Sequence, residues 1–181
     1  MRSGAVVVAA GLLLALAGCV PTVHDPASPS PSATPVFSSD AAALKAAEAA
    51  YAAYLKVSDQ IANDGGKDPE RFSTVVTSRW LPTELSSASK LEESGRHQTG
   101  VTASSSLTLE QVGQDDQGAE LVAYTCLDLT GTRILNAVDE DVTPGSRQAK
   151  VSLEVTFRSK AGSASQLLVD SNEPWSGPTF C

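Results

Sequence analysis

The spacing of apolar residues along the chain changes from a helical to a strand-like pattern. In the first half, apolar side chains recur at steps of three and four, the pattern of one buried helical face. The residues of this face are Leu44, Ala47, Tyr51, Tyr54, Leu55 and Ile61. Any of residues 38–40 can cap the start, and Gly65-Gly66 marks the end. The pattern predicts one long, alanine-rich helix packed against a sheet.

Two shorter helices are expected next. Asp68-Pro69-Glu70 combines a cap, a proline in the first turn and an acid that favours the helix dipole, so it opens a helix. This helix should turn three apolar residues inward: Phe72, Val75 and Val76. Trp80-Leu81-Pro82 interrupts the run, and a third helix is expected over residues 83–93, ending at Gly95.

The second half of the chain has the period of strands. Residues 150–158 alternate strictly between apolar and polar side chains, which indicates one buried and one wetter face. Residues 119–129 are apolar on both faces, as in a central strand, and a polar hairpin-type loop at 113–118 precedes them. The expected strands span residues 102–112, 119–129, 132–138, 150–158 and 165–170. This order predicts an α+β fold, with three N-terminal helices packed on a curved antiparallel sheet of about four to five strands.

The N-terminus has the pattern of a targeting segment. A short positive start precedes 13 apolar or glycine residues at 5–17, fewer than the roughly 20 that a membrane-spanning helix needs. The following Leu16-Ala17-Gly18-Cys19 resembles the lipobox of bacterial lipoproteins, in which the cysteine thiol carries diacylglycerol and becomes the mature N-terminus. Two acyl chains would anchor the protein at the outer face of the cell membrane. The alternative is ordinary signal cleavage nearby, with a free Cys19.

Composition divides the remaining chain into a tether and a domain. Residues 20–39 hold five of the ten prolines with many Ser and Thr and no apolar periodicity, as in an extended tether. The predicted organisation is a signal peptide at 1–18, a lipidated cysteine and disordered tether at 19–39, and one domain at 40–181. Thirteen Lys and Arg against 21 Asp and Glu give a net charge of −8, which argues against a nucleic-acid partner.

Motifs for catalysis, metals and cofactors are absent from the sequence. His97 is the only histidine after residue 39, so a solvated or capping histidine is the expected role. The sequence has no nucleophile elbow, no zinc-ligand spacing, no calcium loop and no phosphate-binding glycine pattern. Asp139-Glu140-Asp141 and Asp115-Asp116 are interpreted as solvated loop charges, with a weak surface calcium site as the alternative. We therefore expect no catalytic residue, no metal site and no cofactor.

Three features together resemble a known group of proteins. They are the lipobox, the run Gly95-Arg96-His97-Gln98-Thr99-Gly100 that would open the first long strand, and the pair Cys126 and Cys181. They resemble secreted actinobacterial lipoproteins of the nuclear transport factor 2-like (ketosteroid isomerase-like, cystatin-like) cone fold. The resemblance implies that one long and two shorter helices cover a strongly bent sheet, and that a C-terminal cysteine meets one on a central strand.

The cysteine count agrees with that implication. If Cys19 carries lipid, Cys126 and Cys181 are the two that remain, and export places them where disulfides persist. A Cys126–Cys181 bridge would hold a Pro- and Gly-rich tail that otherwise frays. The alternative is a buried free Cys126 with a loose Cys181.

The resemblance also implies one enzymatic option. Relatives of this fold can hold a small apolar ligand in the cone mouth, between an Asp base and Tyr donors. The candidate strand acids are Glu110, Glu120, Asp128, Glu154 and Asp170. The candidate phenols are Tyr51, Tyr54 and Tyr124, and for the first two the ordinary role is core packing with the hydroxyl on a polar neighbour. Nothing in the sequence tells which of these side chains point inward.

The expected function is therefore non-catalytic. The sequence favours a lipid-anchored envelope protein whose domain binds a small hydrophobic molecule, an envelope polymer or a partner protein. The alternatives are a small-molecule enzyme of isomerase or hydratase type and a structural module of a larger complex. An enclosed cavity with a buried carboxylate and a facing tyrosine would favour the enzyme. An apolar cavity would favour a ligand binder, and a filled cone an interaction module.

Overall fold

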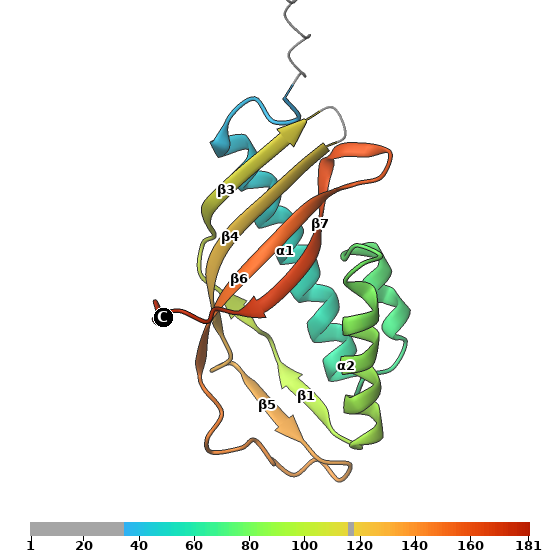
Figure 1. Ribbon diagram of the computed structural model, residues 1–181. Helices are drawn as coiled ribbons and strands as arrows, with labels where there is room; N and C mark the ends of the chain where they lie inside the picture. The colour runs from blue at the N-terminus through green and yellow to red at the C-terminus, as the bar shows by residue number, and fades with distance from the viewer. Residues whose placement is uncertain (1–34, 116–117) are drawn as a thin grey trace, which may run out of the picture. The chain divides into compact units, whose positions relative to one another are not determined.

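The computed structural model describes residues 35–115 and 118–181 (Figure 1). The signal peptide, Cys19 and most of the expected tether lie outside these residues. The elements are α1 (Asp40–Asn63), the 3₁₀ helix η1 (Pro69–Thr74), α2 (Leu81–Glu93), β1 (His97–Gly100), β2 (Ala103–Ser104), β3 (Thr108–Asp115), β4 (Gly118–Asp128), β5 (Thr132–Leu135), β6 (Lys150–Lys160) and β7 (Ser163–Pro174). This arrangement confirms the predicted α+β class.

The long helix α1 forms where the apolar spacing predicted it. The Ser39 side chain accepts a hydrogen bond from the Ala42 backbone N–H at 3.2 Å, which caps the first turn. The buried face consists of Ala43, Ala47, Tyr51, Tyr54, Asp59 and Ile61. Leu44 and Leu55 are only partly buried at its border. Gly65 and Gly66 follow with φ of 71° and 89°, a left-handed conformation that ends the helix.

The second and third helices differ in detail from the prediction. The segment after Asp68 is a 3₁₀ helix, and of the apolar residues expected to face inward only Phe72 belongs to it. Val75 and Val76 follow it and are buried. The third helix begins at Leu81, so the expected interruption over residues 80–82 is wrong. Pro82 is compatible with the first helical turn, because the N–H that proline lacks would have no helical partner there.

The predicted curved sheet is a curled antiparallel sheet of five strands. Its order is β2-β4-β6-β7, and β3 pairs with the same edge of β4 as β2. The central position expected for residues 119–129 is confirmed, because β4 is paired on both sides. The alternation in β6 is also confirmed: Leu153, Val155 and Phe157 are buried against α1 and the core. The last strand, β7, is longer than expected and runs from residue 163 to 174.

The first long strand expected over residues 102–112 does not form as one piece. It is divided into β2 and β3, with Leu107 turned into the core between them, and β3 extends through residues 113–115 of the expected loop. The run 97–100 does not open this strand. It forms β1, which pairs with β5 in a separate two-stranded sheet, and β5 ends at Leu135 rather than residue 138. At Gly100 (φ 90°) a Cβ would lie 2.0 Å from the Gly131 carbonyl oxygen, so a side chain would prevent this close approach.

The space between α1 and the concave side of the sheet is filled with side chains. The largest fully buried apolar residues there are Tyr51, Ile61, Leu121, Val155, Phe157 and Val169. Figure 1 shows α1 crossing behind this sheet, and α2 packs against η1 and α1. The core also includes Phe37, which is 7% exposed and whose N–H donates to Gln114 Oε1 at 2.7 Å. The packed domain therefore begins before Asp40, and the last residues assigned to the tether belong to it. No helix among the described residues has the length and apolar character needed to cross a membrane.

Candidate functional site

Four of the five strand carboxylates proposed as possible bases lie on the outer side of the sheet. Glu120 forms an ion pair with Arg158, and Asp128 accepts hydrogen bonds from Thr130 and lies 3.6 Å from Lys150 Nζ. Glu110, Glu120, Asp128 and Glu154 occupy outward or bulge positions of the register, opposite in parity to the buried residues of β4 and β6. None of these four can serve a reaction in the interior.

Asp170 is buried, but it is already fully engaged. It occupies the extra position of a β-bulge in β7, where Phe157 pairs with Val169 and Thr156 with Ser171. Its carboxylate accepts hydrogen bonds from Thr77 Oγ1 (2.6 Å), Arg79 Nε (3.0 Å) and Arg158 Nε (2.9 Å). These contacts join β7 to β6 and to the segment before α2, which is a structural role.

A different carboxylate, Glu84 of α2, meets the tyrosines of α1. Tyr54 donates to Glu84 Oε1 at 2.8 Å, and Trp80 Nε1 donates to the same oxygen at 2.8 Å. Asn172 of β7 donates to the Tyr54 hydroxyl at 3.2 Å and accepts from Tyr51 at 3.3 Å. Burial, and then the charge of Glu84, raises the pKa of Tyr54, and burial raises the pKa of Tyr51. Both phenols stay protonated at neutral pH and act as donors that join α1, α2 and β7.

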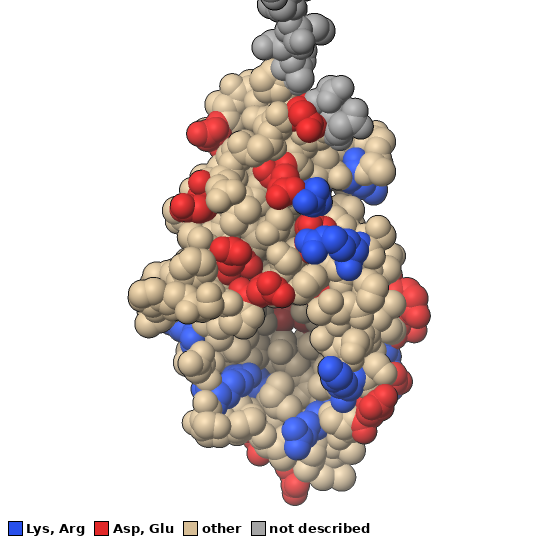
Figure 2. Space-filling view, in the orientation of Figure 1, with Lys and Arg blue, Asp and Glu red and all other residues tan. Residues whose placement is uncertain are grey.

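The space beside this network is small. Glu84 lines a cleft of about 120 Å³ between α1 and α2, whereas small-molecule pockets are typically about 300 Å³ or more. Figure 2 also shows the surface hollowed between the end of β7, α2 and the β1–β5 pair. The pairing of a buried carboxylate with a facing tyrosine is present, beside a cleft smaller than a typical small-molecule pocket.

The remaining polar candidates have local partners. His97 Nε2 lies 3.4 Å from Asp139 Oδ1, at a half-buried position on β1. Asp141 accepts from the Thr143 N–H at 2.9 Å and lies 3.7 Å from Arg133; its hydrogen bonds with Thr143 lower its pKa. In the part of the chain that the structure describes, no group of three or more His, Cys, Asp or Glu side chains could hold a metal ion.

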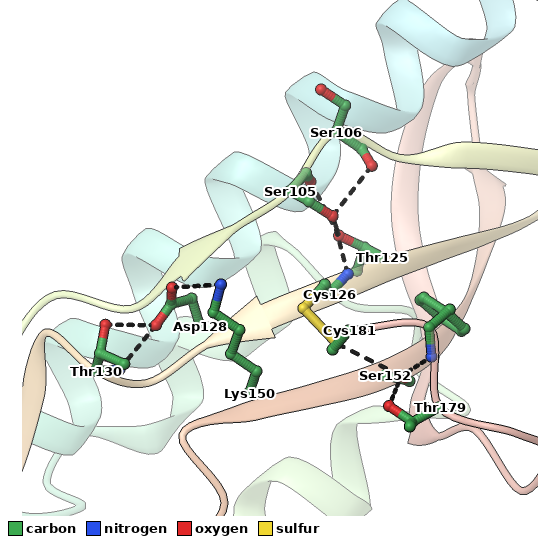
Figure 3. Close-up of a disulfide and its surroundings, with 11 residues drawn as sticks. Ser105, Ser106, Thr125, Cys126, Asp128, Thr130, Lys150, Ser152, Thr179 and Cys181 are labelled. Atoms are coloured by element: carbon green, nitrogen blue, oxygen red, sulfur yellow. Dashed lines mark hydrogen bonds and ion pairs between the residues drawn. A yellow bond between two sulfur atoms is a disulfide. The ribbon is translucent and has the colours of Figure 1, made fainter.

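The C-terminal segment folds back across the outer side of the sheet. Cys181 lies at disulfide distance from Cys126 of β4, with 5.5 Å between the Cα atoms, consistent with the expected bridge (Figure 3). Ser152 of β6 fastens the same segment: its backbone carbonyl accepts from the Trp175 N–H at 2.8 Å and its hydroxyl accepts from the Phe180 N–H at 3.0 Å. Figure 3 shows Ser152 beside the sulfurs and Thr179. The last seven residues are thus held at both ends.

This tail brings three aromatic rings together, which we call the aromatic face: Tyr124, Trp175 and Phe180. The ring centroid of Tyr124 is 4.8 Å from that of Trp175 and 5.8 Å from that of Phe180. Phe180 remains 47% exposed. An open groove of about 560 Å³ runs between Tyr124, Phe180 and the disulfide on one side and the break between β2 and β3 on the other. A third of the nine aromatic residues of the chain lie on this outward surface.

Carboxylates surround the aromatic face. In the sheet register Tyr124 is paired with Glu154, and Glu154 with Glu173, so the three form one row across β4, β6 and β7. Burial, contact with Glu154 and the charges of Glu154 and Glu110 raise the pKa of Tyr124. Figure 2 shows acidic side chains over this side of the sheet. Among the described residues, no Lys or Arg forms an ion pair with Glu110, Glu154 or Glu173.

The fold and the site define an α+β domain with a curled antiparallel sheet and an aromatic outer surface. No family profile and no curated protein matches the sequence. Among solved structures, the crystal structure of the intermembrane space region of the chloroplast protein ARC6 is similar, with a TM-score of 0.52 and 13% sequence identity. The match covers 74% of this chain and 97% of that one. At this identity the likeness shows the fold alone.

The sequence patterns did not identify the buried carboxylate of α2 or the two aromatic residues of the C-terminal tail. Trp80, at the N-cap of α2, is followed at steps of four by Glu84 and Ala88, and that spacing could have placed Glu84 on the buried side. Trp175 and Phe180 lie outside any periodic segment, but two aromatic residues in a seven-residue tail are a signal in so aromatic-poor a chain. The ring contacts themselves depend on the tail folding back, which no local pattern encodes.

Proposed function

We propose that this protein is a lipid-anchored envelope protein whose domain binds a partner through the aromatic face, without catalysis. The observation that carries the proposal is the aromatic face itself. Its three rings lie on the outer side of a sheet whose inner side is filled, and a tail fixed at Cys181 and Ser152 holds two of them. Large, rigid aromatic side chains are the residues that supply most binding energy at protein interfaces.

The location of the protein outside the cell membrane is part of this proposal. The lipobox-like Leu16-Ala17-Gly18-Cys19 and the proline-rich segment after it support a domain tethered outside the cell membrane. The disulfide-distance pair Cys126 and Cys181 fits an oxidising compartment. The similar solved structure is described as an intermembrane space region, which agrees with a domain outside the cytoplasm. Membership of the cone-fold lipoproteins remains part of the proposal.

Site-specific cross-linking in the native cell tests the proposal. A photoreactive benzoyl-phenylalanine at position 180 keeps an aromatic ring in the face, and the same residue at Val138, which is 71% exposed near β5, is the matched control. We expect a discrete adduct from position 180 and none from position 138. Equal labelling from both positions, or no adduct at 180, would contradict binding through this face. Mass spectrometry of the mature N-terminus tests the anchor, and an unmodified Val20 or Pro21 there would exclude lipidation of Cys19.

The second candidate is an enzyme of isomerase or hydratase type, and one observation favours it. Glu84 is a buried carboxylate that accepts from Tyr54, the pair that such chemistry needs. The cleft of about 120 Å³ beside it argues against a substrate of metabolite size. Incubation of the protein with envelope extract separates the two. Product formation that is lost in Glu84→Gln but kept in the exposed Glu48→Gln control would establish the enzyme, and retention of an unchanged partner supports binding.

A further inference from the structure

We propose that the aromatic face and the carboxylates around it bind a basic protein segment, with a lysine or arginine side chain held against the rings. This inference rests on the proposed function and names the chemistry of the partner. The sheet register places Tyr124, Glu154 and Glu173 in one row, and the tail lays Trp175 and Phe180 against Tyr124. Rings and negative charges therefore share one surface.

The other carboxylates of the sheet form ion pairs within the domain. Glu120 is paired with Arg158, Asp128 with Lys150, and Asp170 with both Arg79 and Arg158. Each of these acids has a cation supplied by the domain. Within the described residues, no such ion pair is formed by the three acids near the aromatic face: Glu110, Glu154 and Glu173.

This charge arrangement is unfavourable in the free protein. Glu154 and Glu173 are directly opposite each other on neighbouring strands, and like charges in such pairs destabilise a sheet. The charge of Arg79 acts on Glu173 from beyond ion-pair distance, while the chain as a whole carries a net charge of −8. A bound cation would relieve this repulsion. A ring within about 6 Å of a lysine or arginine group adds a cation–π attraction, strongest over Trp.

An open groove of about 560 Å³ lies beside the aromatic face. Its walls include Tyr124 and Phe180, and its far rim carries the hydroxyls of Ser105, Ser106 and Thr108 at the break between β2 and β3. Ser105 Oγ already accepts from the Cys126 N–H at 3.0 Å, which fixes that rim relative to the disulfide (Figure 3). A preformed groove costs little ordering on binding. An anionic lipid surface would be repelled by the same carboxylates, and an uncharged sugar would leave them uncompensated.

Fluorescence anisotropy with a labelled lysine octapeptide tests the inference. The full chain in detergent micelles is titrated at low and at physiological ionic strength, since an electrostatic contact weakens with salt. One cation–π contact or one charge pair is worth about 1 kcal/mol, so Trp175→Leu and Glu154→Gln should each weaken binding about fivefold. Glu48→Gln, which removes the same charge from the exposed side of α1, should change it less than twofold. Thermal unfolding of each variant confirms that it is folded.

Three outcomes would overturn the inference. The octapeptide does not bind, or it binds Trp175→Leu as well as the unaltered protein, or a neutral tetramer of N-acetylglucosamine binds with the same dependence on Trp175. If the photoreactive residue at position 180 still gives its adduct, only the basic partner is wrong. If that adduct is also missing, the proposed binding through this face fails as well.

Discussion

Asp170 offers the sharpest test of how this sheet is held together. Asp170→Asn keeps the size of the side chain but removes the negative charge between Arg79 and Arg158. The amide can still accept a hydrogen bond at its oxygen, but its NH₂ group would face guanidinium or hydroxyl donors. The variant therefore leaves two arginines without their shared partner.

The magnitude follows from the burial of the three groups. Removal of one partner from a fully buried ion pair costs about 3–5 kcal/mol, and a surface pair is worth about 0–1 kcal/mol. Asp170 is 1% exposed, but the side chains of Arg79 and Arg158 are 63% and 51% exposed. Water can therefore solvate the released guanidinium groups. We expect a loss of about 2 kcal/mol in the free energy of unfolding, between those two limits.

The pH dependence gives an independent check. Burial alone would raise the pKa of Asp170, but hydrogen bonds from Arg79, Thr77 and Arg158 outweigh it and lower the pKa below the ordinary 3.8. A carboxyl whose pKa is lower in the folded state contributes stability above its unfolded pKa, and this is lost as pH falls through the folded value. The difference between the protein and Asp170→Asn should be constant at neutral pH and shrink below about pH 4.

Urea unfolding followed by the fluorescence of Trp80 and Trp175 measures this difference. The matched control is Asp64→Asn, which breaks the 2.7 Å ion pair between Asp64 and Arg71. The Asp64 side chain is 53% exposed, so this variant should lose less than about 1 kcal/mol in the free energy of unfolding. Equal stability losses for the two variants would refute the argument from burial. A difference for Asp170→Asn that persists unchanged at low pH would refute the argument from charge.

Three further predictions concern the tail, the helix junction and the tyrosine network. Replacing both Cys126 and Cys181 by serine should lower the free energy of unfolding by up to about 4 kcal/mol, because the bridge closes a sequence separation of 55. Thermal unfolding measures this loss. Two reactive thiols besides Cys19 in the non-reduced, unfolded protein would exclude the bridge. Gly66→Ala should cost more than Gly162→Ala in thermal unfolding, because a Cβ at residue 66 meets the Ala88 carbonyl oxygen at 2.2 Å whereas residue 162 has open space. Equal losses would contradict the close approach of the turn after α1 to α2. Tyr54→Phe should cost about 1–2 kcal/mol in urea unfolding, because the hydroxyl joins Glu84 to Asn172, and an unchanged stability would contradict that network.

The local elements could largely be predicted from the sequence. The helical face of α1 and the strict alternation in β6 are properties of neighbouring residues, and Ser39 and Gly65-Gly66 bound α1 through their own backbone preferences. Periodicity also showed that β4 is central, since both of its faces are apolar. These features need no knowledge of distant parts of the chain.

Boundaries that depend on distant residues could not be predicted. The strand expected over residues 102–112 is divided at residues 105–107, where the Ser105 carbonyl accepts from the Thr125 hydroxyl at 2.9 Å and Leu107 is buried in the core. Before the break, Asp59 of α1 accepts hydrogen bonds from the Thr102 N–H and hydroxyl, at 2.9 and 2.6 Å. Phe37 joins the core through Gln114, 77 residues away in sequence. A pattern of nearby residues contains no information on such contacts.

The candidate sites show the same division. The sequence by itself identified Cys126 and Cys181 as a pair and Tyr51 and Tyr54 as core tyrosines with polar partners, and the structure agrees with both expectations. Only the tertiary structure decided that four of the strand carboxylates lie outside the core and that Glu84 of α2 meets Tyr54 instead, because the two faces of a strand differ by one residue and a bulge at Asp170 shifts the register. It also created the aromatic face, since Trp175 and Phe180 reach Tyr124 only when the tail is folded back over β4 and β6.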